Sequence, residues 1–407
     1  MTAVSRQLRP LRQAGFRLLA VATLGSSVGT LLAAIALAID VKDRTNSGLW
    51  VGAVLVVAYL PTVVIGLTLG PLLDRLPRRD LMIGADLVRA AAFFALPFTG
   101  APGVIVALAA VAGVANGFFR PAVYAGIPNL VPDEELPAAN ALLQAMENVS
   151  WAIGPILGGL LTAAAGPHTA YWINGVSFLV SAVLIARIPA RMLQSEIALT
   201  RGHWRDLGDG FLAVIRSRPL LAVLVAWGIA CFGIGGANVT EVFLAKNTFH
   251  AGDFGYGLLY GAIGGGLVVG SFLGSVLLER IGPAKTYAGA LVLMALGFGG
   301  AAASPDIWVA AACAVVGGAG DGGAIVCNAV FVQRGAADEM RGRALTFVMS
   351  ATFLATAIAN GIAGALLSTV SPRWIWGGAA AAYALAAAVG YVLAREPRTA
   401  PAVEPAH

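Results

Sequence analysis

Long apolar stretches separated by short polar segments run along the whole chain. A helix needs about 20 mostly apolar residues to span a bilayer. Twelve stretches meet that need, and each is 18 to 28 residues long. They predict twelve transmembrane helices at Phe16–Ile39, Leu49–Leu73, Leu81–Phe98, Val104–Ile127, Ala138–Ala165, Tyr171–Ile188, Leu220–Ala245, Tyr256–Leu278, Thr286–Ala303, Ile307–Val332, Ala344–Val370 and Trp374–Leu393.

The composition agrees with this pattern. Of the 407 residues, 58% are hydrophobic and only 12% are charged, against roughly 25% charged in an average soluble domain. A soluble globule of this length would expose much of its apolar surface. We therefore predict an all-α polytopic membrane protein with no sizeable soluble domain. The first apolar run is too long for the core of a cleaved signal peptide, so we expect it to remain as a helix.

The positions of Arg and Lys predict the orientation of the helices. With a cytoplasmic N-terminus, the cytoplasmic segments hold 20 of these residues and the external loops hold 4. Loops rich in positive charge stay in the cytoplasm. Both termini are therefore expected on the cytoplasmic side of the cell inner (plasma) membrane. The same rule explains the net charge of +5, so we expect no binding to nucleic acid.

The two halves of the chain repeat each other. Asp74-Arg75 and Glu279-Arg280 end the second and eighth stretches at a spacing of 205 residues, and Asn116 and Asp321 have the same spacing. Duplicated halves are typical of secondary transporters, whose substrate site lies between them near the middle of the membrane. We expect two pseudo-symmetric six-helix bundles at 1–188 and 219–394, a cytoplasmic central loop at 189–218 and a cytoplasmic tail at 395–407.

Two motifs carry a family resemblance. Residues 70–79, Gly-Pro-Leu-Leu-Asp-Arg-Leu-Pro-Arg-Arg, resemble the G-x-L-x-D-R-x-G-R-R signature of the major facilitator superfamily, although Pro77 replaces a Gly. Residues 151–159, Trp-Ala-Ile-Gly-Pro-Ile-Leu-Gly-Gly, resemble the G-P-x-x-G-G motif of its exporters. Loops at 131–142 and 338–343 resemble those of the enterobactin-exporter and macrolide-efflux group. The resemblance implies the major facilitator fold, drug:proton antiport and a monomer that suffices for transport.

The first motif implies a cytoplasmic gate. A negative charge at the C-terminal end of a helix is unfavourable unless it is paired, and the neighbouring arginines are candidates to pair with Asp74. Such a cluster would latch the two halves together in the outward-facing state. The alternative is that the arginines only set the topology. The residues assigned to this gate are Gly70, Asp74, Arg75, Arg78, Arg79, Glu279 and Arg280.

The second motif predicts a close helix contact. Gly154 and Gly158 share a helix face, where small residues let two membrane helices approach closely. Pro155 loosens the helical hydrogen bonds locally. We expect these residues and Gly159 to form an export-motif seam against the opposite half, which opens and reseals during transport. Ordinary helix packing is the alternative.

Ionisable residues inside the spans are functional candidates, because charge is costly at membrane depth. Asp86 and Arg89 are three residues apart and are expected to form a local ion pair. Glu241 lies near the external end of its span, where water reaches it. Arg120 and Glu147 lie on adjacent spans at depths of about 10 and 14 Å, counted at 1.5 Å per residue. They are therefore expected to pair.

Asp321 is about 16 Å deep by the same count and has no evident partner, while Asn116 is its counterpart in the first half. A buried carboxylate can bind and release a proton during transport, because burial and nearby Arg have opposite effects on its protonation. We assign proton coupling to Asp321 and Glu147, with Arg120 as modulator; the alternative for the latter two is a static pair. The expected substrate cavity holds Asn116, Arg120, Glu147, Glu241 and Asp321.

These features together predict a secondary active transporter. The favoured function is proton-coupled efflux of small amphipathic, drug- or siderophore-like molecules by alternating access, and the alternative is a proton-coupled uptake symporter. An intramembrane enzyme is not expected, since the four histidines lie in predicted loops or the tail and no HExxH occurs. No Walker A loop is present, so ATP is not the direct energy source. Neither a cofactor nor a metal is expected.

Overall fold

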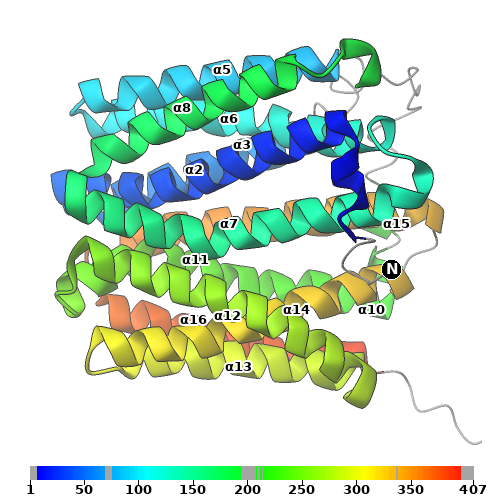
Figure 1. Ribbon diagram of the computed structural model, residues 1–407. Coiled ribbons are helices and arrows are strands. Elements are labelled where there is room, and N and C mark those ends of the chain that lie inside the picture. The colour runs from blue at the N-terminus through cyan, green and yellow to red at the C-terminus, as the bar shows by residue number, and fades with distance from the viewer. Residues whose placement is uncertain are drawn as a thin grey trace, which may run out of the picture.

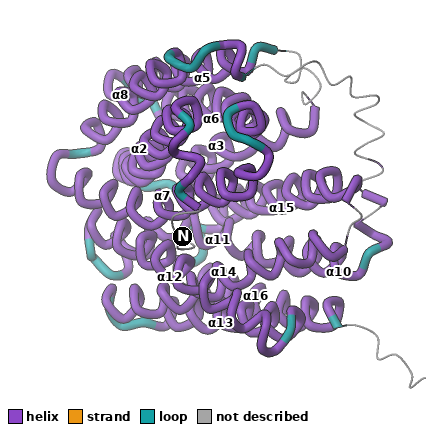
Figure 2. The backbone as a smooth tube through the Cα atoms, turned by 45° about the vertical axis from the view of Figure 1, so that its right-hand side comes forward, coloured by secondary structure: helices purple, strands orange, loops and turns teal. Residues whose placement is uncertain are grey.

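The computed structural model describes residues 7–68, 76–193, 208, 211–212, 214–335 and 338–395. Within these ranges the chain is built of helices and short connections, with no strand (Figure 2). Twelve of the helices described there are long and apolar enough to cross a membrane, so the predicted number of spans is confirmed. Most of the expected central loop and of the expected tail lies outside these ranges.

The first six spans are α2 (Ala14–Thr45), α3 (Gly48–Thr68), α5 (Arg78–Ala95), α6 (Pro102–Gly126), α7 (Leu136–Ala165) and α8 (Pro167–Ala186). The seventh span is one continuous rod made of α10 (Arg218–Ala222), the π-helical segment η6 (Val223–Trp227), α11 (Gly228–Phe243) and the π-helical segment η7 (Leu244–Thr248). The last five are α12 (Gly252–Ile281), α13 (Pro283–Ala303), α14 (Ile307–Gly335), α15 (Asp338–Leu366) and α16 (Pro372–Ala394).

The spans lie side by side in two groups, α2 to α8 and α10 to α16 (Figure 1). The groups meet mainly where α7 packs on α12 and where α3 packs on α15. Residues near both ends of the described chain lie at the same end of the bundle, which we call the terminal face. The opposite end, which carries Asn46, Gly166 and Ser304, is the distal face.

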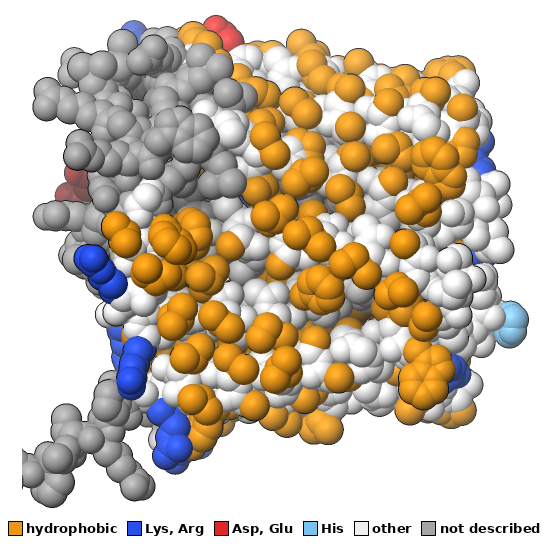
Figure 3. All heavy atoms as spheres, turned by 180° about the vertical axis from the view of Figure 1, so that it is seen from behind, with side chains coloured by type: hydrophobic (Ala, Val, Ile, Leu, Met, Phe, Trp, Pro, Cys, Tyr) orange, Lys and Arg blue, Asp and Glu red, His pale blue; other side chains and the backbone are white. Residues whose placement is uncertain are grey.

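Apolar side chains cover the broad side of the molecule seen in Figure 3, and Lys and Arg are confined to its edges. Large exposed apolar residues occur on most of the spans, among them Val180, Phe272, Leu296, Leu385 and Val392. Such a surface would be unstable in water and is suited to lipid tails. The helices therefore turn apolar faces both inward to each other and outward to the membrane.

Glycine sets the tightest connections and contacts. Gly166 and Gly282 have positive φ values of 77° and 81°, and each forms a one-residue connection followed by a proline that begins the next helix. Proline suits the first turn of a helix because its missing N–H would have no partner there. Between α12 and α14, a Cβ atom on Gly270 would lie 1.9 Å from the carbonyl oxygen of Ala319. Only glycine allows these two backbones to lie so close.

Candidate functional site

Arg120 on α6 and Glu147 on α7 form an ion pair, with 2.9 Å between Nη2 and Oε2. The hydroxyl of Tyr124 donates a second hydrogen bond to Glu147, at 3.1 Å. The pairing expected from the sequence is confirmed. The Arg120 side chain is 46% exposed and that of Glu147 is 14% exposed. Contact of a half-exposed guanidinium with lipid tails would be costly, so this arrangement favours a site that water can reach.

A second charged cluster is sealed inside the first group of helices. Arg89 on α5 pairs with Asp86, as expected, and donates a hydrogen bond to Asn116 on α6 at 3.2 Å. Its guanidinium lies 4.1 Å from the ring centre of Phe119 and 4.3 Å from that of Phe178. Arg89 is 4% exposed. Asn116 is therefore engaged in a buried ion-pair cluster.

Asp321 on α14 occupies the position in the second group that Asn116 occupies in the first, but its surroundings differ. The positions 205 residues after Asp86 and Arg89 are Leu291 and Met294, both fully buried. The buried Oδ1 of Asp321 has no hydrogen-bond partner among the described residues. Cys231 on α11 and Tyr383 on α16 lie within electrostatic range of this carboxylate. Asp321 thus lacks the arginine that its counterpart contacts.

Glu241 on α11 differs from the expectation. The sequence places it near the end of a span, where water would reach it, but the structure leaves it only 1% exposed. Its Oε1 has no hydrogen-bond partner among the described residues. The reason is that the seventh span extends past Glu241 to Thr248, and that α11 packs mainly on α15 and α16 while η7 packs on α12 and α16. The hydropathy of one segment cannot show which neighbouring helices pack beside it and bury its side chains.

The expected cytoplasmic gate is described only in part. Gly70, Asp74 and Arg75 lie outside the described residues. Arg78 donates to the carbonyl oxygen of Ala125 at 2.8 Å, and Arg79 donates to that of Ala186. Both acceptors belong to the same group of helices as the arginines. Glu279 and Arg280, at the end of α12, are exposed.

The export-motif seam has two sides. Cβ atoms on Gly154 and Gly158 would lie 2.8 Å from Leu31 and 2.5 Å from the carbonyl oxygen of Leu32, both on α2 of the same group. A Cβ atom on Gly159 would instead lie 2.7 Å from the Cα of Gly257 on α12, in the opposite group. Of the three glycines, Gly159 therefore forms the close contact across the two halves.

An ion bridge at the distal face joins the two groups and was not identified from the sequence. Lys246 on η7 pairs with Asp43 on α2, with 2.7 Å between Nζ and Oδ2, and also with Asp253 on α12. We call these three residues the distal ion bridge. The sequence did contain an indication of this bridge. The first and seventh spans occupy equivalent positions in the two repeated halves, and both end in charged residues.

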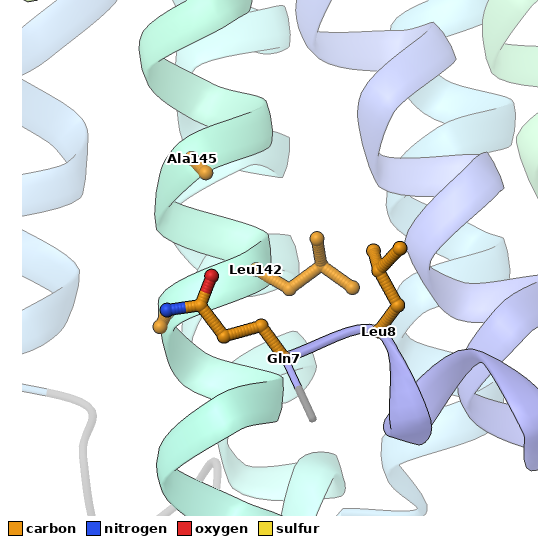
Figure 4. Close-up of a pocket in the computed structure, with 5 residues that line it drawn as sticks. Gln7, Leu8, Leu142 and Ala145 are labelled. Carbon is orange, nitrogen blue, oxygen red and sulfur yellow. The ribbon is translucent and has the colours of Figure 1, made fainter. Parts of the chain in front are cut away.

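Two pockets lie away from these charged clusters, and both are lined by uncharged side chains. One lies at the terminal face between the N-terminal segment and α7 (Figure 4), lined by Gln7, Leu8, Ala141, Leu142 and Ala145. The other is a groove between α11, α15 and α16, lined by Leu224, Val225, Gly228, Ile229, Phe232, Ala355, Ala382 and Leu385. Neither offers a group that binds a proton.

Residues 5–406 match the family model described as transmembrane secretion effector. The chain is 26% identical over 280 residues to the uncharacterized MFS-type transporter YkuC of Bacillus subtilis. The matched region covers 64% of each protein. The chain is 22% identical over 258 residues to macrolide efflux protein A of Streptococcus pyogenes. That matched region covers 61% of this chain and 64% of the relative. The chain thus spans just under two thirds of the length of these relatives.

The fold is shared with solved transporters. A solved variant of the nucleoside transporter NupG superimposes with a TM-score of 0.78 at 12% identity, over 94% of this chain and 100% of that one. At this identity the similarity establishes the major facilitator fold and nothing about the substrate. The family match over almost the whole chain shows that it belongs to the transmembrane secretion effector family of the major facilitator superfamily.

Proposed function

We propose that this transporter exports small amphipathic molecules from the cytoplasm in exchange for protons, by alternating access. The charge distribution supports a terminal face in the cytoplasm, because Arg and Lys are concentrated in the segments that meet there. The protein then lies in the cell membrane with both termini inside. One chain holds both halves and the cavity between them, so a monomer suffices for the cycle.

The single observation that carries the proposal is the exposure of the Arg120–Glu147 pair within the membrane span. Arg120 is six residues from the end of α6 at the terminal face, or about 9 Å at 1.5 Å per residue. A 46% exposed guanidinium at that depth supports a water-filled cavity that opens to the terminal face. In the proposed orientation, this is the cavity that receives substrate from the cytoplasm.

The contacts between the two groups support the same state. Among the described residues, close contacts run from Trp151 and Gly264, near mid-membrane, through Gly159 and Gly257 to the distal face. Gly48 lies against the carbonyl oxygen of Gly364 at that face, where the distal ion bridge also joins the groups. A closed distal face and an open terminal face describe the inward-facing state of an alternating-access cycle.

Proton coupling is assigned to Asp321 and Glu147, with Arg120 as modulator. Asp321 is the stronger candidate, because its buried oxygen has no partner and no arginine replaces the one beside Asn116. Ionised, such a carboxylate is costly to bury, so it favours a bound proton whenever water is excluded. Glu147 already has Arg120 and Tyr124 as partners and would respond mainly when substrate displaces one of them.

The proposed substrates are amphipathic and drug-like. The name of macrolide efflux protein A, one of the relatives, supports this class, as does a family described by secretion. Of the five residues expected to line the cavity, Arg120 and Glu147 lie where water can reach them, and Asp321 is proposed deeper in the same cavity. Asn116 is instead engaged with Arg89, and Glu241 is buried near the closed distal face. In the outward-facing state the proposed gate at the terminal face is Gly70, Asp74, Arg75, Arg78, Arg79, Glu279 and Arg280.

The direction of transport tests this function. The purified protein is inserted into liposomes with the terminal face outward, and the lumen is made acidic. An exporter that exchanges protons then accumulates substrate from a panel of amphipathic compounds, including a macrolide. A proton-coupled uptake symporter would instead accumulate its substrate when the terminal face is in the lumen and the outside is acidic. That result would contradict the proposal.

A further inference from the structure

Glu241 is a buried acid to which the cycle above gives no role in proton binding. It lies two residues before the end of α11 at Phe243, close to the distal face. It is 1% exposed, and its Oε1 has no hydrogen-bond partner among the described residues. The hydroxyl of Tyr383 on α16 is also buried without a hydrogen-bond partner in the described part of the chain.

The positive charges near the distal face have other partners. Lys246 pairs with Asp43 and Asp253, and Lys42 also lies 3.7 Å from Asp43. Arg44 pairs with Asp40 at 2.6 Å.

The segment 347–366 of α15 contains no ionisable residue. The titratable and charged groups on the distal parts of the elements that pack against α11 are Asp40, Lys42, Asp43, Arg44, Lys246, Asp253, Tyr256, Tyr260, Arg373 and Tyr383.

The remaining cation, Arg373 at the start of α16, is engaged with a different part of the molecule. It donates a hydrogen bond to the carbonyl oxygen of Ala302 at 2.7 Å, and its guanidinium lies 5.1 Å from the ring centre of Phe249. No ion pair between Glu241 and a described Lys or Arg is present. In this closed arrangement the described residues therefore include no cation that balances a negative charge on Glu241.

We propose that Glu241 is a third proton-binding acid of the transport cycle, beside Asp321 and Glu147, and that its protonation allows the distal face to close. The inference rests on the proposed function, which it deepens by adding a group that links the proton to the gate. An ionised carboxylate without a partner is strongly disfavoured in a dry interior, whereas the neutral acid is tolerated. The closed distal face thus requires neutral Glu241.

Opening of the distal face reverses this preference. When the contacts of Gly159 with Gly257 and of Lys246 with Asp43 separate, water enters beside α11 and the ionised form of Glu241 is hydrated. Proton binding therefore favours the closed state, and its loss favours the open one. For one proton, the ratio of closed to open molecules changes by at most about tenfold per pH unit. Glu241 takes its proton from, and returns it to, the water on the distal side, so this acid sets which face is open, while the proton carried across the membrane stays assigned to Asp321 and Glu147. The sign suits an exporter, since a proton bound from outside returns the empty carrier to the cytoplasm-facing state.

The test measures the distance between the two groups at the distal face as a function of pH. Spin labels are placed at Ala165, at the end of α7, and at Ser368, just after α15, which are both exposed. The three native cysteines are replaced in this background. In lipid nanodiscs the wild type should populate a longer distance as the pH rises. Glu241→Gln should stay closed over the same pH range.

Asp306→Asn is the matched control. Asp306 is an acid in the distal loop before α14, where it accepts hydrogen bonds from the N–H groups of Trp308 and Val309. Its loss should leave the pH response of the wild type unchanged. Should Glu241→Gln not accumulate in the membrane, Glu241→Met is the second variant, with the same expectation of a face that stays closed.

Two results would overturn the inference. One is a wild-type distance that does not change with pH, and the other is a Glu241→Gln variant that opens with the same pH dependence as the wild type. The proposed function fails separately, through the absence of proton-driven export by the wild type in liposomes. A retained pH response in Glu241→Gln together with proton-driven export would remove only the role of Glu241.

Discussion

The Nζ of Lys246 lies 2.7 Å from Oδ2 of Asp43, and this ion pair joins the two six-helix groups at the distal face. The Lys246 side chain is 14% exposed and that of Asp43 is 46% exposed, so water screens the pair in part. Lys246 also holds Asp253 at the start of α12, next to the close contact of Gly159 with Gly257. Charge pairing and backbone packing therefore close the same end of the molecule.

Removal of Lys246 should open the distal face more often. An exposed ion pair contributes about 0.2–1 kcal/mol, so Lys246→Met should raise the open-to-closed ratio by up to about fivefold per pair lost. The readout is the distance between spin labels at positions 165 and 368, which lengthens when the distal face opens. Lys42→Met is the control, since Lys42 also lies near Asp43 but belongs to the same helix. Equal distance distributions in the two variants would contradict the bridging role.

A methyl group at Gly159 should prevent the distal face from closing. Its Cβ would lie 2.7 Å from the Cα of Gly257 and 3.0 Å from the carbonyl oxygen of Asp253. Overpacking of this kind costs about 1–3 kcal/mol, and here the cost falls on the closed state. Gly159→Ala should therefore slow transport about tenfold or more while the protein still accumulates in the membrane.

Gly289→Ala is the matched control for that substitution. Gly289 lies within α13, and a Cβ atom there would meet nothing within 4 Å. Because Ala is favoured over Gly in a helix by about 1 kcal/mol, this variant should transport normally and be at least as stable. Normal transport by Gly159→Ala would show that the export-motif seam is ordinary helix packing.

The sequence was sufficient to predict the helices and one side-chain pair. Hydropathy and length determine which segments can span a membrane, and each of the twelve predicted segments coincides with a spanning helix. Their described ends differ from the predicted ones by up to six residues, as at the end of α2 and the start of α15, and the predicted end of the second span lies outside the described residues. Arg120 and Glu147 were paired correctly because adjacent antiparallel spans bring residues of similar depth together. The same reasoning identified the local pair of Asp86 and Arg89.

The sequence was not sufficient wherever the relevant contact depends on the packing of distant helices. The position of Glu241 along its span does not reveal that the helices packed around α11 leave it only 1% exposed. The bridge from Lys246 to Asp43 depends on how two groups of helices meet, and 203 residues separate its ends. Likewise, the spacing of Gly154 and Gly158 predicts a close contact but not that its partner is α2 of the same group.

The proposed orientation predicts which loops react from outside. Cysteines placed at Ser47 and His168, both at the distal face, should be labelled by an impermeant reagent in intact cells. Cysteine at Ser195, in the central segment, should react only after the membrane is made permeable. Strong labelling of position 195 from outside would reverse the topology and with it the direction of transport.

The two acids assigned to proton coupling should contribute unequally when they are neutralised one at a time. Asp321→Asn should reduce proton-driven transport by about a hundredfold or more, since a neutral amide cannot carry a proton through the cycle. Glu147→Gln should reduce it less, because Tyr124 and Arg120 can still hydrogen-bond to the amide. Glu134→Gln, at an exposed acid near the terminal face, is the control. A larger loss in Glu147→Gln than in Asp321→Asn would reverse their assigned order.

Transport by the doubly neutral protein tests proton-coupled export most directly. Asp321→Asn combined with Glu147→Gln is reconstituted in liposomes beside the wild type, and substrate movement is followed with and without an imposed pH difference. The wild type should concentrate substrate against its gradient. The double variant should only move substrate down its gradient, whether or not the pH difference is imposed. Uphill accumulation by the double variant would contradict the assignment of these two acids as the proton carriers.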